Sequence, residues 1–377
     1  MAIGKYIYGI ISSNPTRIGL PNPTGVDLPK PFKEGSNLLK EGLNTHDAVG
    51  SYGIPACKEV YFIPYQDIVA VVNDAEVVNY THMFKEALAR RLVEHQKVIE
   101  RIMDIGYSII PIRLGTFAMN EEEVKDILSK GYGLIKEIIP KISDKIEIDV
   151  VTTWSDLNAT IKEVGKEKEI KEFKEELLSN PKGITVDDQL KVGSMLKQAL
   201  GKLKELYASQ IQLTLKTLSI DFRTHELMDD NMIMNCAFLI DKVKQNEFYS
   251  KIEDLNNGFA QELDFRCVGP LPAYSFYTLE IKKMQFNDVN WARKKLGILN
   301  DAVSKDEIKK VYQRQAFTFH PDKNPHSPGI EKEFDEIKKS YDLLLDYAQA
   351  CAQAGEVSLV FNKDEFKKNA VLVKVKE

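Results

Sequence analysis

The tripeptide His320-Pro321-Asp322 constrains the fold more than any other stretch, because it separates two helical patterns. Ser304 followed by Glu307 is a capping box that starts the first helix, and Pro321 prevents this helix from continuing past His320. Apolar residues recur at helical spacing on both sides: Ile308, Tyr312, Gln315 or Ala316, and Phe319, then Phe334, Ile337, Tyr341 and Leu344. Two amphipathic helices joined by a loop of this length pack antiparallel and hold the loop at their tip.

The face of the first helix opposite its apolar residues is basic. It carries Lys305, Lys309, Lys310 and Arg314. The loop from His320 to Ile330 contains the helix breakers Pro325, Pro328 and Gly329. A short helix over Trp291–Ile298 is expected to pack against the pair. On these residues alone, a plain helical hairpin with a proline turn is an alternative to a docking loop.

This segment resembles the J domain of DnaJ-type co-chaperones. The matching residues are Leu296-Gly297-Ile298, Ser304–Lys310, Tyr312, Ala316, His320-Pro321-Asp322-Lys323-Asn324-Pro325 and Phe334–Leu344. The resemblance implies a domain that performs no chemistry itself, but binds a DnaK-type chaperone and triggers its ATP hydrolysis. It assigns docking to His320, Pro321 and Asp322 and to the basic helix face. The Asp322 carboxylate can pair with an arginine of the partner, and the basic face steers toward an acidic surface.

Two residues depart from the pattern of the J-domain family. Gln313 stands after Tyr312 where the family usually has Lys or Arg, and Thr318 stands before Phe319 where a Lys is common. Both changes reduce the positive charge beside the loop. We therefore expect a weaker affinity for the chaperone than is usual in the family, with a J-like region that has lost activity as the alternative.

Length and composition are those of a folded protein with two or three domains. The 377 residues are 43% hydrophobic and 28% charged, which is ordinary for a globular protein. The net charge of −5 argues against nucleic acid as the main partner, because phosphate binding needs a clear basic excess on some surface. The basic helix is only a local excess, and Asp306 and Glu307 lie within it.

No metal, cofactor or membrane is expected from the sequence. The four cysteines, Cys57, Cys236, Cys267 and Cys351, lie far apart and lack the spacing of a zinc or redox motif, so we expect buried thiols in a reducing cytosol. Met1–Ser12 lacks the pattern of a signal peptide, and no stretch has the apolar length of a membrane span. These features predict a cytoplasmic protein.

The first part of the chain mixes strand and helix patterns. We expect first a strand over Lys5–Ile11, a functional or disordered loop over 13-55, and a hairpin of Glu59–Ile63 and Asp67–Asn73 with a Pro64-Tyr65 turn. A helix capped by Thr81 and ending near Gly106 is expected next, followed by a strand over Tyr107–Arg113. The last two elements are a helix capped by Asn120 and closed by Pro140, and a strand over Ile146–Trp154.

The second part begins with a helical hairpin and then returns to strands. The hairpin is formed by a charged helix over Ser155–Asn180 and a helix over Asp187–Leu218. It is followed by a buried strand over Met232–Ile240, a helix with Phe248, Ile252 and Leu255, and a strand over Glu262–Val268. After the basic helix and its partner, we expect short strands over Val357–Phe361 and Ala370–Val375.

These elements predict an α+β protein with two α/β (ferredoxin-like) domains, a helical segment between them, and the all-α J domain. The expected domains are 1-150, an α/β domain that includes the 13-55 loop; 151-285, the helical hairpin with a second α/β domain; 286-350, the J domain; and 351-377, a tail with two short strands.

Four pieces of the body resemble the GvpF/GvpL family of gas vesicle proteins. They are Tyr6–Ile10, His95–Glu100 leading to Ile110–Thr116, Asn235–Ile240 and Val268–Phe276. The family often has Phe at the position of Leu114 and Trp at that of Leu271, and both changes keep an apolar residue. The resemblance implies an accessory factor for building gas vesicles, associated with the hydrophobic shell subunit GvpA and with other vesicle accessory proteins.

The two resemblances together imply a co-chaperone for vesicle assembly. A subunit that builds a gas-facing wall exposes apolar surface before assembly, and such surface aggregates unless it is covered. The body would hold this subunit, and an appended J domain would bring a DnaK-type chaperone to it. Tyr274 and Phe276 are candidate client-binding residues, with closure of the sheet core as the alternative. A general J-domain co-chaperone with another client is the competing function.

An enzyme is the least supported function class. The sequence lacks the P-loop, G-x-S-x-G, H-E-x-x-H and G-x-G-x-x-G motifs. Arg113–Thr116 could hold an anion near the following helix, but a plain turn between strand and helix is preferred. His95 is expected to be a packed, hydrogen-bonded core residue rather than a metal ligand, because no second His or Cys lies at metal spacing.

Overall fold

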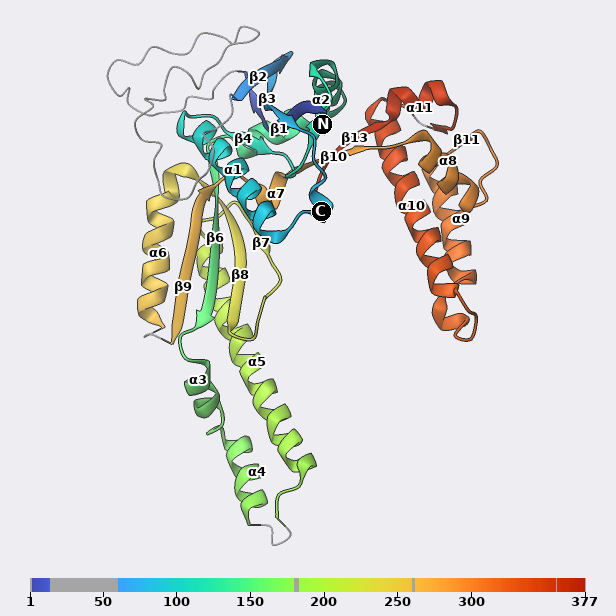
Figure 1. Cartoon of the computed structure of the whole chain (residues 1–377). Helices are drawn as coiled ribbons and strands as arrows, with labels where there is room; N and C mark the ends of the chain where they lie inside the picture. Colours follow the sequence, from blue (N-terminus) through green and yellow to red (C-terminus); the bar gives the residue numbers. More distant parts are fainter. Residues whose placement is uncertain (1, 14–59, 180–182, 260–261, 357, 377) are drawn as a thin grey trace, which may run out of the picture. The chain divides into compact units, whose positions relative to one another are not determined.

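The computed structural model describes residues 2–13, 60–179, 183–259, 262–356 and 358–376. The chain folds into two compact units, whose elements are labelled in Figure 1. Unit 1 comprises Met1–Ser143 and Tyr277–Glu377, and unit 2 comprises Asp144–Phe276. The J segment is therefore grouped with the N-terminal sheet, which differs from the expected division at 150 and 285. Apart from Ser13, the predicted 13-55 loop lies outside the described residues.

Unit 1 contains a sheet with the strand order β2-β3-β1-β4, in which all pairings are antiparallel and β5 also pairs with β1. The strands are β1 (Ile3–Ser12), β2 (Val60–Tyr65), β3 (Ile68–Glu76), β4 (Ile109–Pro111) and β5 (Phe117–Ala118). The predicted hairpin is confirmed, but Pro64 lies within the ladder opposite Val69 instead of in the turn. Since β2 is an edge strand, it tolerates the missing N–H of proline.

Helix α1 (Lys85–Asp104) of unit 1 starts later than predicted. Thr81 lies in the 3-10 helix η1 (Tyr80–His82), which is capped by the side chain of Asn79. The predicted cap of α1 by Thr81 is therefore wrong. The backbone of Phe84 is extended before the helix begins, and no side chain caps α1.

Helix α2 (Glu121–Ile142) begins as predicted, because the Asn120 side chain accepts a hydrogen bond from the Glu123 backbone N–H. Its predicted end at Pro140 is wrong by half a turn, since the helix continues to Ile142. Ile138 and Ile142 are both buried, so the packing of the last turn outweighs the hydrogen bond that proline cannot donate.

Unit 2 contains a second antiparallel sheet, with the strand order β7-β8-β6-β9. Its strands are β6 (Lys145–Trp154), β7 (Asp221–Thr224), β8 (Met232–Asp241) and β9 (Leu263–Leu271). Helices separate the first strand from the second and the third from the fourth, which is the ferredoxin-like arrangement. In unit 1, β1 to β4 take the same order as β6 to β9, so the predicted α+β class with two ferredoxin-like sheets is confirmed.

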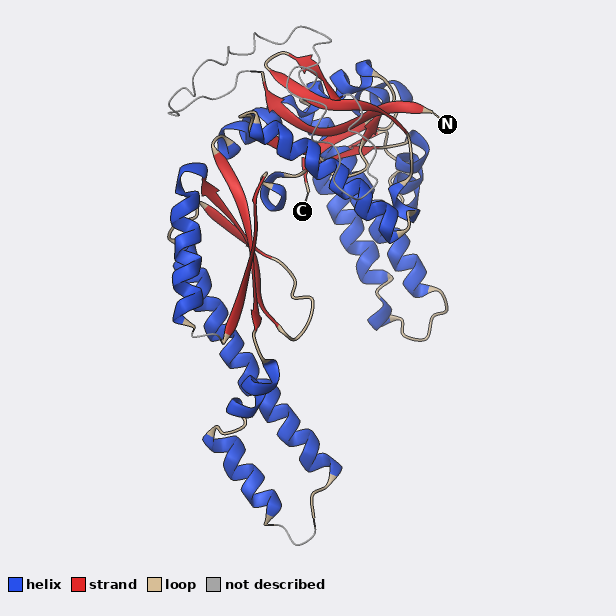
Figure 2. Cartoon of the chain, turned by 60° about the vertical axis from the view of Figure 1, so that its left-hand side comes forward, coloured by secondary structure: helices blue, strands red, loops and turns tan. Residues whose placement is uncertain are grey.

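Helices α5 (Val186–Lys216) and α6 (Gln245–Gly258) cover one face of the unit 2 sheet (Figure 2). Tyr207 of α5 packs on Trp154, and Phe248 of α6 packs on Phe238, with ring centroids 5.7 and 5.5 Å apart. The single charged helix predicted over 155–180 is two helices, α3 (Leu157–Val164) and α4 (Lys168–Leu178), because Gly165 ends the first. The helical segment connects β6 to β7, so it belongs to the second ferredoxin-like domain and does not lie between two domains.

The C-terminal part of unit 1 carries the predicted helical pair. Its helices are α8 (Phe286–Lys295), α9 (Lys305–Thr318), α10 (Ile330–Gln353) and α11 (Lys363–Asn369). The capping box of Ser304 and Glu307 at the start of α9 is confirmed. Strand β10 (Leu279–Lys283) pairs with β13 (Val371–Val375), and β11 (Ala302–Val303) pairs with β12 (Leu359–Val360), so both short C-terminal strands are confirmed.

Candidate chaperone-docking surface

Helices α9 and α10 position the loop that contains the tripeptide. The rings of Tyr312 and Tyr341 stack with their centroids 3.9 Å apart and join the two helices. The Gln315 side chain donates to the Leu296 carbonyl over 2.9 Å, which ties α9 to the end of α8. Ile308 and Leu344 are fully buried between the helices. The tip of the hairpin is thus supported by stacked rings, a hydrogen bond and an apolar core.

The loop itself is closed by local hydrogen bonds. Pro321–Lys323 form the 3-10 helix η3, and the Asp322 backbone N–H donates to His320 Nδ1 over 3.2 Å. The Asn324 amide donates to the carbonyls of Thr318 at 2.9 Å and of His320 at 3.1 Å. These contacts satisfy carbonyl groups that the end of a helix leaves without an intrahelical partner. The chain alone therefore gives the loop a defined conformation.

His320 and Asp322 differ in exposure. The His320 ring packs edge-on against Phe334 of α10, with the centroids 5.3 Å apart, and its side chain is 44% exposed. The Asp322 side chain is 89% exposed, and its Oδ2 lies 3.7 Å from His320 Nδ1. The imidazole is thus held by the helices while the carboxylate projects into solvent. Asp322 is available for a charge-assisted hydrogen bond with a cation of a partner.

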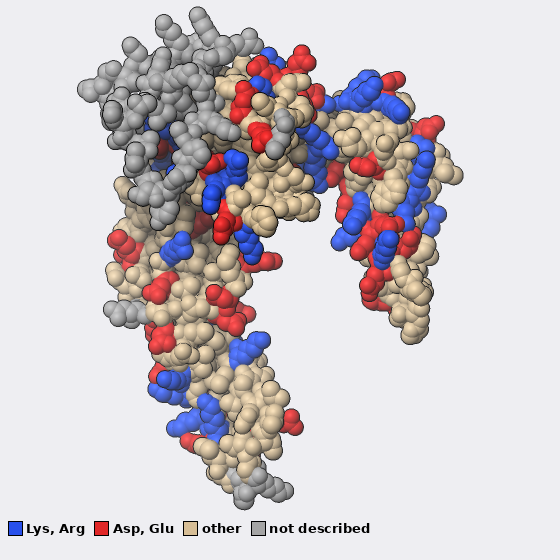
Figure 3. All heavy atoms as spheres, viewed as in Figure 1, with Lys and Arg blue, Asp and Glu red and all other residues tan. Residues whose placement is uncertain are grey.

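The basic residues predicted on α9 are all exposed. They are Lys305, Lys309, Lys310 and Arg314. At about 100° per residue, Lys305 and Lys309 share one side of the helix, and Lys310 and Arg314 share another. Within the described residues none of the four forms an ion pair. Acidic side chains lie among basic ones on the face of the J domain drawn in Figure 3, so the positive surface is narrow.

Phe317 is an exposed feature of this surface that the sequence interpretation missed. Its side chain is 67% exposed, and Lys323 Nζ lies 2.8 Å from the centroid of its ring. A cation over an aromatic face is attracted by the ring quadrupole, which links the loop to the outer side of α9. The apolar residues of α9 recur at helical spacing, and Phe317 does not fit this spacing. An apolar residue outside the spacing is expected to be exposed, so the sequence did contain a signal for Phe317. Gln313 is exposed on the same helix.

The two candidate client-binding residues lie on the short helix α7 (Tyr274–Tyr277), and they differ in burial. Phe276 is 5% exposed, and the Arg223 guanidinium lies 5.8 Å from its ring centroid. Its burial favours the alternative role in core closure, and Phe276 offers no surface to a client in this conformation. Tyr274 is half-buried, and its client-binding role stays a prediction.

Ser275, between these two aromatic residues, contacts a buried carboxyl group that the sequence interpretation missed. Glu147 of β6 is 1% exposed and accepts hydrogen bonds from the Ser275 N–H at 2.8 Å and hydroxyl at 2.7 Å. Burial raises the pKa of the Glu147 carboxyl to about 8 and also raises the pKa of Asp149. His225 Nε2 lies 3.1 Å from the Ser275 hydroxyl. Here the hydroxyl bridges acid and imidazole, whereas a hydrolytic triad needs the imidazole in the middle.

His95 is a packed core residue, as expected, and the Arg113 side chain belongs to an ion pair. His95 is 3% exposed, its Nδ1 lies 2.8 Å from the Tyr6 hydroxyl, and burial lowers its pKa to about 4. The Arg113 guanidinium pairs with Glu280 of β10. Across the described residues, no group of three His, Cys, Asp or Glu side chains could hold a metal ion. The described helices also include none long and apolar enough to cross a membrane.

Two family models match separate parts of the chain. The model described as gas vesicle synthesis protein GvpL/GvpF matches residues 4–278. The chain belongs to the GvpL/GvpF family. The model of the DnaJ domain matches residues 294–350, which contain α9, the following loop and α10 except for its last three residues, so this GvpL/GvpF member carries a J domain.

Relatives of the body are remote and share its fold. Gas vesicle protein F of a Nostoc species is 24% identical over 50% of this chain and 78% of its own length, and that of Microcystis aeruginosa is 22% identical over 74% and 100%. The crystal structure of gas vesicle protein GvpF from an Anabaena species superposes with a TM-score of 0.55 at 22% identity, covering 74% of this chain and 99% of that one.

The J domain is more similar in sequence to its relatives than the body is, but the similarity covers only a short segment. Chaperone protein DnaJ of Oleidesulfovibrio alaskensis is 47% identical over 51 residues, which are 14% of this chain and 13% of the relative. The chain therefore spans only a small part of the DnaJ proteins that it matches. What it shares with them is the helical hairpin with its loop.

Proposed function

We propose that this GvpL/GvpF family member is an accessory protein of gas vesicle assembly that binds the hydrophobic shell subunit GvpA and, through its J domain, recruits and stimulates a DnaK-type chaperone. The observation that carries the proposal is the preformed His320-Pro321-Asp322 loop, with its carboxylate 89% exposed, in one chain with a body of the vesicle family. Other vesicle accessory proteins are proposed as further partners.

The proposal answers a physical problem of vesicle assembly. A shell subunit with a large apolar surface aggregates before it reaches the growing wall. A chaperone that alternates between a tightly and a loosely binding state prevents this aggregation if something directs it to the subunit. The J domain shifts the chaperone between these states by binding one of them better, and the body supplies the choice of client.

Electrostatics supports docking on α9. The four basic residues of α9 are exposed and form no ion pair among the described residues, so they are available to an acidic partner. This attraction is screened within about 8 Å at physiological ionic strength, so docking is expected to weaken as salt is added. Gln313 and Thr318 add no charge beside the loop, and they favour the second candidate function, a scaffold with an inactive J-like domain.

The test is aggregation of purified shell subunit diluted from denaturant, followed by light scattering. The full chain with a DnaK-type chaperone and ATP is expected to reduce scattering more than either protein alone. His320→Gln should remove this gain, whereas His326→Gln, at an exposed histidine of the same loop, should keep it. If neither variant changes the gain, the inactive scaffold is favoured. If the chain has no effect on the shell subunit but protects another client, the general co-chaperone is favoured.

A further inference from the structure

Two segments around the J domain fall outside both family matches: residues 279–293 and 351–377. The first contains β10 and the second contains β13, and these strands pair antiparallel from Leu279 with Val375 to Lys283 with Val371. The two strands form a clasp, defined by Leu279–Lys283 and Val371–Val375. The parts of the chain that neither family explains therefore meet each other at the two ends of the J domain.

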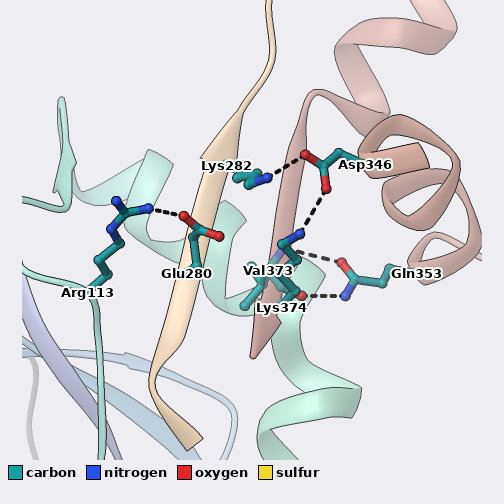
Figure 4. Close-up of polar contacts among 7 residues, drawn as sticks. All are labelled: Arg113, Glu280, Lys282, Asp346, Gln353, Val373 and Lys374. Atoms are coloured by element: carbon teal, nitrogen blue, oxygen red, sulfur yellow. Dashed lines mark hydrogen bonds and ion pairs between the residues drawn. The ribbon is translucent and has the colours of Figure 1, made fainter. Parts of the chain in front are cut away.

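Strand β10 joins the clasp to the first sheet and its helix. The Leu279 carbonyl accepts a hydrogen bond from the Arg113 N–H over 2.9 Å, directly after β4. The Arg113 guanidinium also pairs with the Glu280 carboxylate (Figure 4). Farther along β10, Lys283 Nζ lies 2.6 Å from the carboxylate of Glu123, at the start of α2. Backbone and side-chain contacts thus hold β10 on the N-terminal part of unit 1.

Helix α10 joins the clasp to the J domain. Its Asp346 carboxylate accepts Lys282 of β10 at 2.6 Å and Lys374 of β13 at 3.0 Å (Figure 4). The Gln353 side chain of the same helix bonds both the N–H and the carbonyl of Val373. The side chains of Asp346 and Lys374 are 14% and 19% exposed, so their ion pair is partly shielded from water. Both strands of the clasp are therefore fixed to α10.

Neighbouring residues of β13 pack on opposite faces of the strand. Leu372 is fully buried in the hydrophobic core of the J domain. Val373, also fully buried, packs against α2 at Gly131, where an added Cβ would lie 2.9 Å from Val373 Cγ1. Since successive side chains of a strand point to opposite faces, β13 is a layer between the J domain and α2. Gly131 allows this close approach because it has no side chain.

We propose that the clasp is an intramolecular interface that holds the J domain in one orientation on the sheet of unit 1. A chaperone docked at the His320-Pro321-Asp322 loop then acts from a fixed direction on a client held by the body. This action on a client rests on the proposed function, whereas the interface itself does not. The J domain follows the body along the chain, as expected from the sequence, and the clasp holds it at both of its ends.

The experiment measures residual dipolar couplings of the full chain, with no chaperone or shell subunit present. In the natural sequence, one alignment tensor is expected to fit the amides of β1, β3, α9 and α10. Gly131→Leu should push β13 from α2 and require separate tensors for the sheet and the J domain. Gly133→Leu is the matched control, because it changes the same helix at an exposed position where an added Cβ meets nothing within 4 Å. The control should keep one tensor.

A second pair of variants tests the interface even if the Gly131→Leu variant does not fold. Asp346→Ala removes the two ion pairs that join the clasp to α10, and Asp342→Ala changes an exposed carboxylate one turn away on the same helix. Amide exchange over Val371–Val375 should rise at least tenfold in Asp346→Ala and stay unchanged in Asp342→Ala. Separate tensors in the natural sequence, or equal exchange in both variants, would overturn the proposal. Because no partner is present, such a failure leaves the proposed function standing.

Discussion

The two sheets share a strand order but bury opposite kinds of ionisable group near their first strands. In unit 1, Tyr6 of β1 contacts His95, a base whose pKa burial lowers to about 4. In unit 2, Glu147 of β6 is an acid whose pKa burial raises to about 8. Both groups are kept neutral by exclusion from water. The same topology thus provides a site for a buried polar group, while the residue placed there sets the direction of the pH response.

Truncating the core of one sheet has the largest expected effect and tests whether the units are independent. Phe238 of β8 is fully buried against Phe248, so Phe238→Ala should lower the free energy of unfolding of unit 2 by about 3–5 kcal/mol. Ile10→Ala in β1 is the counterpart in unit 1. Hydrogen exchange resolved by segment should show each loss in its own unit. Equal losses in both units from one substitution would contradict the division.

Raising the pH should weaken unit 2. The folded-state pKa of Glu147, about 8, lies above its ordinary value of 4.5, so its stabilising effect is full below pH 4.5 and is lost as the pH rises toward 8. The loss in free energy of unfolding is on the order of a few kcal/mol. Glu147→Gln stays uncharged and should flatten the profile. Exchange of the β6 and β8 amides at several pH values measures it, and a profile that the substitution leaves unchanged would refute the assignment.

Lowering the pH should weaken unit 1 instead. The folded-state pKa of His95, about 4, lies below its ordinary value of 6.5, so its contribution is full above pH 6.5 and is lost as the pH falls toward 4. The Tyr6 hydroxyl accepts a hydrogen bond from the Gly115 N–H and also lies within hydrogen-bond distance of His95 Nδ1. Tyr6→Phe leaves this nitrogen without its partner and should cost about 1–3 kcal/mol. Hydrogen exchange of the β1 and α1 amides at several pH values measures the stability of unit 1. A fall in the stability of both units as the pH is lowered would contradict the opposite pH responses.

Predictions of contacts between residues close in sequence had mixed outcomes, because the capping box of α9 was confirmed but the cap of α1 by Thr81 was wrong. The capping box joins Ser304 to Glu307, and the loop is closed by bonds from Asp322 and Asn324 to His320, all within a few positions. Side-chain type and spacing define such contacts before any tertiary structure is known. For this reason the hairpin, its cap and the exposed carboxylate could be derived from the residues alone.

Contacts between distant residues could not be predicted. Lys282 and Asp346 are separated by 64 positions, and Arg113 and Glu280 by 167. No spacing rule connects such pairs, because tertiary packing alone brings them together. The burial of Glu147 was missed for the same reason: its position on β6 gave no sign that Ser275 would return to it.

ATP turnover by a DnaK-type chaperone, measured with the full chain added, shows whether the J domain is active. The natural sequence is expected to accelerate turnover, His320→Gln should return it to the basal rate, and His326→Gln should keep the acceleration. Both variants should retain the unfolding free energy of the natural sequence, because each side chain is at least partly exposed at the loop. Equal turnover with the natural sequence and with His320→Gln would contradict a working J domain in this family member.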